Sequence, residues 1–221
     1  EKEAKEVAAA CKAKGGETIL VPADVSVDAD CRKLAKAALD KWGRIDGLIN
    51  NAGTTKFAQH ADLDALQMED FQRIYSVNVV GPFQMVRAVA PAMQKQGKGA
   101  VTNISSIAGV LGVGSSIAYA ASKGALNTMT LSLARALGPA IRVNTVCPGF
   151  VETRWLKAGL GDLYDKQKAN YEAMTPLKSV TYPEDIADAA VWFLEGGAKV
   201  TGEVLIVDAG MHLGAAPLKP R

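Results

Sequence analysis

The sequence predicts an α/β protein in which one doubly wound, parallel sheet carries helices on both of its faces. Helical and strand-like patterns alternate along all 221 residues, with no internal repeat and no linker-like change in composition. The strand-like segments are short apolar runs, as is typical of parallel strands that are buried on both sides. We therefore expect a single domain that spans residues 1–221.

Apolar residues at helical spacing predict five helices, and the first of them ends at the pair Gly15-Gly16. The expected helices cover 1–14, 27–42, 68–96, 116–137 and 184–194, and the expected strands cover 18–22, 45–50, 100–104, 141–146 and 204–207. Pro82 interrupts the longest helix because it has no N–H for the carbonyl of Asn78, four residues earlier. We expect that helix to kink at 79–81; the alternative is that Gly81-Pro82 starts a new helix after a loop, with Asn78 as its cap.

The composition excludes several classes of function. Hydrophobic residues make up 48% and charged residues 22%, and the net charge of +2 is not concentrated in one segment. We therefore expect neither nucleic acid nor membrane as a partner. Three cysteines without metal-ligand spacing argue against a zinc site or a disulfide framework, so we expect no bound metal and a cytoplasmic location.

Small or polar residues follow four of the expected strands. They are Ala23-Asp24-Val25, Asn50-Asn51-Ala52-Gly53, Ser105-Ser106 and Cys147-Pro148-Gly149. In doubly wound folds the ligand binds beyond the carboxyl ends of the strands. We expect these four segments to meet at one edge of the sheet and to carry the chemistry.

Tyr119 and Lys123 lie four residues apart and therefore on one face of the expected helix 116–137. A nearby ammonium favours the phenolate, which brings the tyrosine pKa from about 10 towards neutral pH. By itself such a pair is more often a solvated helix face. Ser106 strengthens the catalytic interpretation because it ends a strand and can reach the reacting oxygen, whereas Ser105, Ser115 and Ser116 fit caps or turns.

Taken together, the motifs resemble those of the short-chain dehydrogenase/reductase family, whose domain is of the Rossmann type. The matching segments, in the family's order, are Asn50-Asn51-Ala52-Gly53, Val77-Asn78-Val79, Asn103-Ile104-Ser105-Ser106, Tyr119-Ala120-Ala121-Ser122-Lys123, Arg142-Val143-Asn144, Pro148-Gly149-Phe150-Val151-Glu152-Thr153 and Thr201-Gly202-Glu203. The resemblance extends from Glu1 to about Gly214. Within the family, the pattern is similar to 3-oxoacyl-carrier-protein reductases and to sugar, polyol and secondary-alcohol dehydrogenases.

The resemblance implies hydride transfer between NAD or NADP and a small-molecule carbonyl or alcohol. Tyr119 would be the general acid/base, and Lys123 would lower its pKa and bind the nicotinamide ribose. Ser106 would polarise the carbonyl, and Asn78 would help to hold a water in a proton relay with Lys123.

The resemblance also implies a set of residues that contact the cofactor. Besides Tyr119 and Lys123, the set comprises Asp24, Val25, Asn51, Ala52, Gly53, Pro148, Gly149, Val151 and Thr153. Asp24 has an alternative interpretation, because an aspartate before a helix is usually an N-cap. Cys147 is best explained as a buried packing residue, and His60 and His212 lie outside every motif.

The glycine-rich turn of the family, with its first strand, first helix and second strand, has no counterpart in the sequence. We expect that a preceding segment supplies it; the alternative is a shortened relative that binds no cofactor. The residues that distinguish NAD from NADP belong to that segment, so the preference cannot be read here.

The segment 154–182 is predicted to be a substrate lid, and its apolar and aromatic residues suggest a substrate with some hydrophobic body. The expected helices 68–96 and 116–137 carry apolar residues on more than one face, including Met85, Val89, Met93, Leu126, Met129, Leu133 and Leu137. The family pairs these helices across a two-fold axis, which implies a homotetramer, with a dimer as the alternative. Two other hypotheses remain open: an inactive protein that still binds cofactor, and a partner-binding protein without a nucleotide site.

Overall fold

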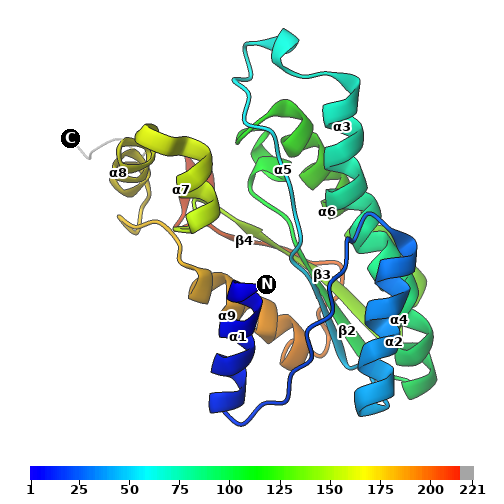
Figure 1. Ribbon diagram of the computed structural model, residues 1–221. Coiled ribbons are helices and arrows are strands. Elements are labelled where there is room, and N and C mark those ends of the chain that lie inside the picture. The colour runs from blue at the N-terminus through cyan, green and yellow to red at the C-terminus, as the bar shows by residue number, and fades with distance from the viewer. Residues whose placement is uncertain (215–221) are drawn as a thin grey trace.

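The computed structural model describes residues 1–214 and contains a four-stranded sheet in the order β1-β2-β3-β4 (Figure 1). The strands are β1 (Gly47–Asn50), β2 (Gly99–Ile104), β3 (Ile141–Pro148) and β4 (Val204–Val207). Every neighbouring pair is parallel, with Asn50 opposite Asn103 and Thr145 opposite Val204. This confirms the predicted α/β class, while 215–221 of the expected domain lie outside the described residues.

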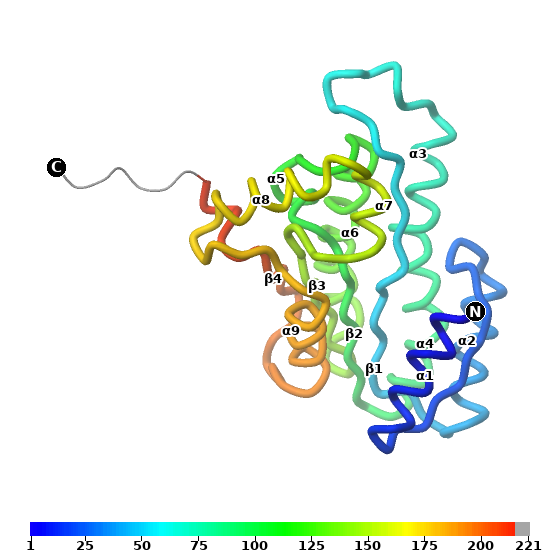
Figure 2. Tube along the Cα trace, turned by 60° about the vertical axis from the view of Figure 1, so that its left-hand side comes forward, coloured from blue at the N-terminus to red at the C-terminus, as the bar shows by residue number. Residues whose placement is uncertain are grey.

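Helices cover both faces of this sheet (Figures 1 and 2). Helices α4 (Gly81–Gln96) and α6 (Ile117–Leu137) pack on one face, and α2 (Asp28–Trp42) packs on the outer side of α4. Helix α9 (Pro183–Glu195) covers the other face. Helix α1 (Lys2–Ala13) has no buried residue.

The remaining elements lie around the carboxyl ends of the strands. They are the short helix Leu63–Ala65, α3 (Met68–Tyr75), α5 (Ala108–Leu111), α7 (Arg154–Leu160), the short helix Gly161–Leu163, α8 (Tyr164–Met174) and the short helix Met211–Leu213. Helices α7 and α8 form the segment that was expected to be a lid.

The main core lies between the sheet and the α2–α4–α6 layer. Its fully or nearly fully buried members include Cys31, Met85, Val86, Val89, Met93, Val101, Ile141 and Val143. A second cluster around Val146, Ile186 and Phe193 joins α9 to the opposite face. Burial of apolar surface on both faces explains why the strands are apolar along their whole length.

The long helix expected over 68–96 is divided by a π-helical turn, Ser76–Val80, between α3 and α4. Within it the N–H of Gly81 donates to the carbonyl of Ser76, five residues earlier. Pro82 follows directly and cannot donate a backbone hydrogen bond. The irregularity expected at 79–81 therefore takes the form of a π turn, a feature that often occurs at functional sites.

One predicted element is wrong, because residues 18–22 do not form a strand. A strand needs a neighbour that accepts and donates its backbone hydrogen bonds. Within residues 1–214, no strand pairs with this segment, and the side chain of Leu20 is half exposed. The apolar pattern of residues 18–22 thus fits a strand, but a strand also needs a neighbouring strand to pair with, which a local pattern cannot predict.

Gly109 allows α5 to approach α6 very closely. A Cβ atom added at Gly109 would lie 2.5 Å from the carbonyl carbon of Lys123 and 2.6 Å from the nitrogen of Gly124. Because both are backbone atoms, neither can move aside without displacing the helix. The glycine therefore sets the distance between the end of β2 and the helix that carries Tyr119 and Lys123.

We predict that Gly109→Ala lowers the free energy of unfolding by about 3 kcal/mol, because the added methyl overlaps backbone on α6. Gly124→Ala is the matched control, since its Cβ would lie 3.4 Å from the carbonyl oxygen of Gly109, close to ordinary contact. Urea unfolding of both variants checks this. Equal destabilisation of the two variants would contradict the proposed role of Gly109.

Candidate active site

A cavity of about 860 Å³ opens at the carboxyl ends of the strands. It is lined by Tyr119, Lys123 and Ser106, together with Asn51, Ala52, Gly53, Pro148, Gly149, Val151 and Thr153 from the strand ends. The structure thus brings together all but three of the residues predicted for the site. The exceptions are Asn78, Asp24 and Val25.

Helix α6 presents Tyr119 and Lys123 to this cavity. The helix begins after Ser116, whose hydroxyl accepts from the N–H of Tyr119 at 3.2 Å, so the predicted capping role of Ser116 is confirmed. The nitrogen of Lys123 lies 5.6 Å from the centre of the Tyr119 ring. The same nitrogen donates to the carbonyl of Ile104, the last residue of β2, at 2.9 Å.

Burial shifts the pKa values of both residues away from the charged forms. The side chain of Lys123 is almost fully buried, and burial lowers its pKa from 10.5 to about 8. Burial also raises the pKa of Tyr119, an effect that the neighbouring Ser106 hydroxyl partly opposes. The free chain therefore keeps Tyr119 as a neutral phenol, although Lys123 had been expected to lower its pKa.

The two serines at the end of β2 have different surroundings. The Ser105 hydroxyl is buried and donates to the carbonyl of Lys123 at 3.1 Å, which ties the strand to α6. The Ser106 hydroxyl lines the cavity and accepts from the N–H of Ala108 at 3.1 Å. Ser105 and Ser115 also border the cavity, but of the two serines at the end of β2 only Ser106 is not buried, so its hydroxyl is the more accessible to a ligand.

Asn78 lies below the cavity wall and is fully buried. Its side-chain oxygen accepts from the N–H of Thr54 at 2.8 Å, and its amide donates to the Thr54 carbonyl at 2.9 Å and to the Ser122 hydroxyl at 3.0 Å. Ser122 in turn donates to the carbonyl of Tyr119 at 2.7 Å. The side chain thus joins the loop after β1 to the helix that carries Tyr119.

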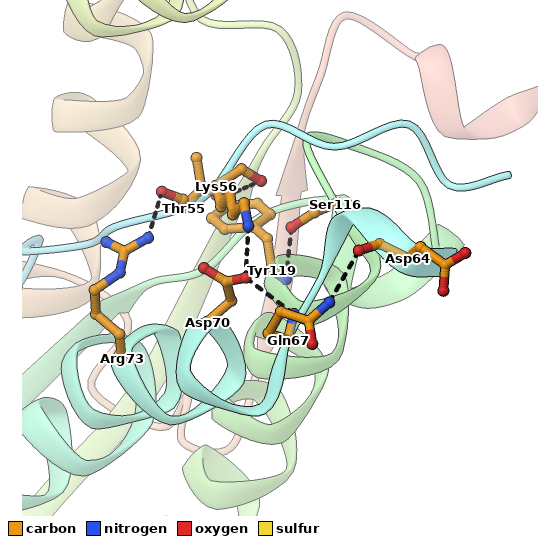
Figure 3. A network of polar contacts seen from close by, with 8 residues as sticks. All are labelled: Thr55, Lys56, Asp64, Gln67, Asp70, Arg73, Ser116 and Tyr119. Carbon is orange, nitrogen blue, oxygen red and sulfur yellow. Dashed lines mark hydrogen bonds and ion pairs between the residues drawn. The ribbon is translucent and has the colours of Figure 1, made fainter. Parts of the chain in front are cut away.

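A second network fixes the same loop from α3 (Figure 3). Lys56 forms an ion pair with Asp70 at 2.6 Å, and Arg73 donates to the carbonyl of Thr55 at 3.2 Å. The Thr55 hydroxyl also lies 2.7 Å from the hydroxyl of Ser115, which precedes α6. The loop 54–58 is therefore fixed both to α3 and to the segment that precedes α6.

Small residues line the sheet side of the cavity. A Cβ atom at Gly53 would lie 3.6 Å from the nitrogen of Lys123, and one at Gly149 would lie 2.6 Å from the Cβ of Asp208. The lining combines glycine, alanine and proline with one buried ammonium, which fits the ribose and ring of a nicotinamide nucleotide. Asp24 and Val25 lie elsewhere, at the start of α2.

The carboxylate of Asp24 accepts from the backbone N–H of Ser26 at 2.9 Å and from its hydroxyl at 2.7 Å. These bonds hold the pKa of Asp24 below its usual range, with the Ser26 hydroxyl as the main cause. Val25 packs into the core, and its carbonyl accepts from the Gln84 amide at 2.8 Å. Both residues have evident structural roles, and their contact with an adenine remains a prediction.

The aromatic residues in and around 154–182, the predicted lid, separate into two groups. Tyr164 is buried with Phe150 and Val180 in a small core against which Leu156, Leu160 and Tyr171 pack. Trp155 instead stays half exposed and lines the cavity together with Phe57. Sequence reasoning missed Phe57, because no local pattern distinguishes an aromatic residue in a loop that faces a distant helix.

Other candidate groups have no part in the site. Cys147 is fully buried, burial raises the pKa of its thiol, and its sulfur lies 3.6 Å from the side-chain oxygen of Asn127, as expected of a packing residue. His212 lies against the carboxylate of Asp208, at 2.9 Å from Nδ1. Within residues 1–214 there is no cluster of possible metal ligands. No helix in the described part of the chain is long and apolar enough to cross a membrane.

Comparison with known proteins agrees with this geometry. The family described as enoyl-(acyl carrier protein) reductase matches residues 1–212. A protein assigned as ketoacyl reductase 2 of the granaticin polyketide synthase from Streptomyces violaceoruber is 42% identical over 197 residues, which cover 89% of this chain and 78% of the relative. The 3-oxoacyl-[acyl-carrier-protein] reductase of Thermotoga maritima is 35% identical over 182 residues, or 81% of this chain and 71% of the relative.

A solved structure shows the same arrangement of elements. It is the crystal structure of a Burkholderia xenovorans protein assigned to the short-chain dehydrogenases/reductases. The sequence identity is 41% and the TM-score is 0.88, over 96% of this chain and 83% of the other.

The buried ammonium of Lys123 should make stability depend on pH. An unfolded lysine keeps its proton up to about pH 10.4, whereas folded Lys123 loses it near pH 8. The folded state thus binds fewer protons between these values, so its stability rises with pH there. We predict that the difference in unfolding free energy, wild type minus Lys123→Met, rises by about 2 kcal/mol from pH 7 to pH 9.5.

Chemical denaturation across this pH range measures that difference directly. Lys36→Met, on the exposed face of α2, controls for the loss of a surface charge. A difference between wild type and Lys123→Met that stays constant with pH would contradict the lowered pKa of Lys123.

Proposed function

Because the chain belongs to the short-chain dehydrogenase/reductase family of NAD(P)-dependent oxidoreductases, we propose that it reduces a small carbonyl compound with Tyr119 as the proton donor. The reverse reaction would oxidise the secondary alcohol. The observation that carries this proposal is the meeting of Tyr119, Ser106 and Lys123 at one cavity, although they come from two different elements.

The proton chemistry follows from the burial of the tyrosine. A phenol whose pKa is raised is protonated at neutral pH, so Tyr119 is ready to act as an acid towards a carbonyl oxygen. Ser106 lines the same cavity and has a hydroxyl that can donate a second hydrogen bond to that oxygen. Two donors at one oxygen would stabilise the negative charge that develops there during reduction.

Lys123 supplies positive charge close to Tyr119. Its nitrogen is fixed by the Ile104 carbonyl, and an ammonium has three donors, so two remain for a ribose or a water. Tyr119 must recover a proton after each reduction, and the neighbouring lysine is the nearest basic group that lines the cavity. A water held near Asn78, as the family resemblance implies, would extend this route to solvent.

The cofactor would be held by the small residues of the sheet side. Bound NADH or NADPH supplies the hydride. Asn51, Ala52 and Gly53 would contact its ribose, and Pro148, Gly149, Val151 and Thr153 would flank its nicotinamide; all of them line the cavity. Asp24 and Val25 would lie further out, towards the adenine.

We also propose that the protein acts in the cytoplasm as a homotetramer. Cys11, Cys31 and Cys147 are all free, which is consistent with a reducing compartment. Met85, Val89, Met93 and Leu126 are buried in this chain, so they cannot form an interface between chains. Phe83 on α4 and Leu131 on α6 stay exposed and are the apolar residues that a partner would cover.

Tyr119→Phe tests the proposed acid. Removal of a positioned acid typically slows a reaction by about 100- to 10,000-fold. We expect this loss in kcat for ketone reduction by the full natural chain with NADH or NADPH, with unchanged circular dichroism and cofactor affinity. Tyr75→Phe, which does not line the cavity, is the matched control. Near-normal turnover by the Tyr119 variant would disprove the mechanism.

Light scattering at micromolar concentration tests the assembly. We expect a particle of four chains, and Leu131→Asp should release smaller species because it buries a carboxylate in the interface. Ser132→Asp, one residue further along the exposed part of α6, is the control. A monomeric wild type would rule out the homotetramer.

A further inference from the structure

Phe57 is held in a fixed position above the cavity by the residues on both sides of it. On one side, Lys56 is ion-paired to Asp70 on α3. On the other, the N–H of Ala58 donates to the carbonyl of Ser115 at 2.9 Å. With its backbone anchored to α3 and to the start of α6, the ring of Phe57 forms a defined wall of the site rather than a mobile loop side chain.

Helix α7 of the lid lies directly on this ring. A Cβ atom at Gly159 would lie 2.0 Å from Cζ and 2.2 Å from Cε2 of Phe57. Trp155, four residues earlier and on the same helix face, has its ring centre 6.1 Å from that of Phe57. The lid therefore meets the rest of the chain at a position where only a glycine leaves room for the phenyl ring.

The lining of the cavity offers no free charge to a substrate. Of the described residues that form it, Lys123 is the only charged one; one of its donors bonds the Ile104 carbonyl, and the other two are assigned above to the cofactor ribose and a water. Three basic groups near the lining are engaged as well: Lys56 with Asp70, Arg73 with Thr54 and Thr55, and Arg154, between the lining residues Thr153 and Trp155, with Glu3. A carboxylate or phosphate on the substrate would thus be buried without a partner, which is costly.

We propose that Phe57 and Trp155 together form the specificity wall of the site, which selects carbonyl compounds with an uncharged, apolar body of several carbons. Gly159 acts as a positioning residue, because its missing side chain lets α7 close on Phe57. This inference rests on the proposed carbonyl reduction. It adds that Phe57 and Trp155 contact the part of the substrate beyond its carbonyl group and select for it.

Three ketones test the selection, with the full natural chain and NADH or NADPH. They are 6-methyl-2-heptanone, 5-oxohexanoate, which replaces its isopropyl end with a carboxylate of similar shape, and 2-butanone, which lacks the distal body. We expect kcat/KM for 6-methyl-2-heptanone to exceed each of the others at least ten-fold. Phe57→Ala should lower the ratio of kcat/KM for 6-methyl-2-heptanone to kcat/KM for 2-butanone about ten-fold. Leu163→Ala, an exposed lid residue outside the cavity lining, should leave the ratio unchanged.

A double-mutant cycle tests the contact without any substrate. Trypsin cleavage after Lys157, in α7, reports how firmly the lid is docked. We expect Gly159→Ala to accelerate cleavage at least five-fold, because its methyl group displaces the Phe57 ring. In the Phe57→Ala background the same change should have no accelerating effect, since the ring is absent and alanine favours the helix.

The outcomes separate this inference from the proposed function. Equal kcat/KM for the three ketones, or an unchanged ratio in Phe57→Ala, would overturn the specificity wall while leaving ketone reduction intact. Additive effects in the proteolysis cycle would overturn the positioning role of Gly159. Failure to reduce any of the three ketones, with the lid coupling still present, would count against the proposed function and against the substrate class drawn from it.

Discussion

The site depends on one buried interaction, the hydrogen bond from the Lys123 ammonium to the carbonyl of Ile104. It joins α6 to the end of β2, and the backbone of Lys123 is also the place where Gly109 lets α5 approach α6. An ammonium in such a position is costly unless it has polar partners. A second hydrogen bond, from the Ser105 hydroxyl to the carbonyl of Lys123, also joins the end of β2 to α6. Together the two bonds hold strand and helix in one arrangement. Tyr119, one turn earlier, is placed by the same constraint.

The loop after β1 is the second fixed part of the site, and Asn78 explains why. Its amide satisfies both backbone groups of Thr54 and reaches Ser122 on α6. Asn78 can do this because it lies in the π turn, in the interruption that Pro82 imposes on the helix. A proline that weakens one helix thus lets a buried amide connect the loop after β1 to α6.

Sequence reasoning predicted the parallel sheet, and most of the site residues that it predicted lie in the cavity lining, because both follow from local signals. Small or polar residues mark the strand ends. The serine cap and the spacing of Tyr119 and Lys123 indicate the helix 116–137. The errors have physical causes of longer range. Residues 18–22 have a strand pattern but no partner, the shape of the irregularity near Pro82 depends on packing, and Phe57 meets Gly159 across about a hundred residues of chain. The last contact has no local signature, since a glycine in a lid helix reads only as a weak helix former.

Burial acts on the two central residues in opposite senses, and this sets the chemistry of the free site. It removes charge from both, so the phenol holds its proton more tightly while the ammonium holds its proton less tightly. Because the two pKa values begin close together in water, these opposite shifts separate them and leave the pKa of Lys123 below that of Tyr119. As the pH rises through 8, Lys123 therefore loses its proton while the Tyr119 phenol keeps its own. In this state Tyr119 holds the proton that the proposed reduction would give to a carbonyl oxygen, whereas the proposed oxidation of an alcohol would need additional positive charge near the tyrosine before it could act as a base.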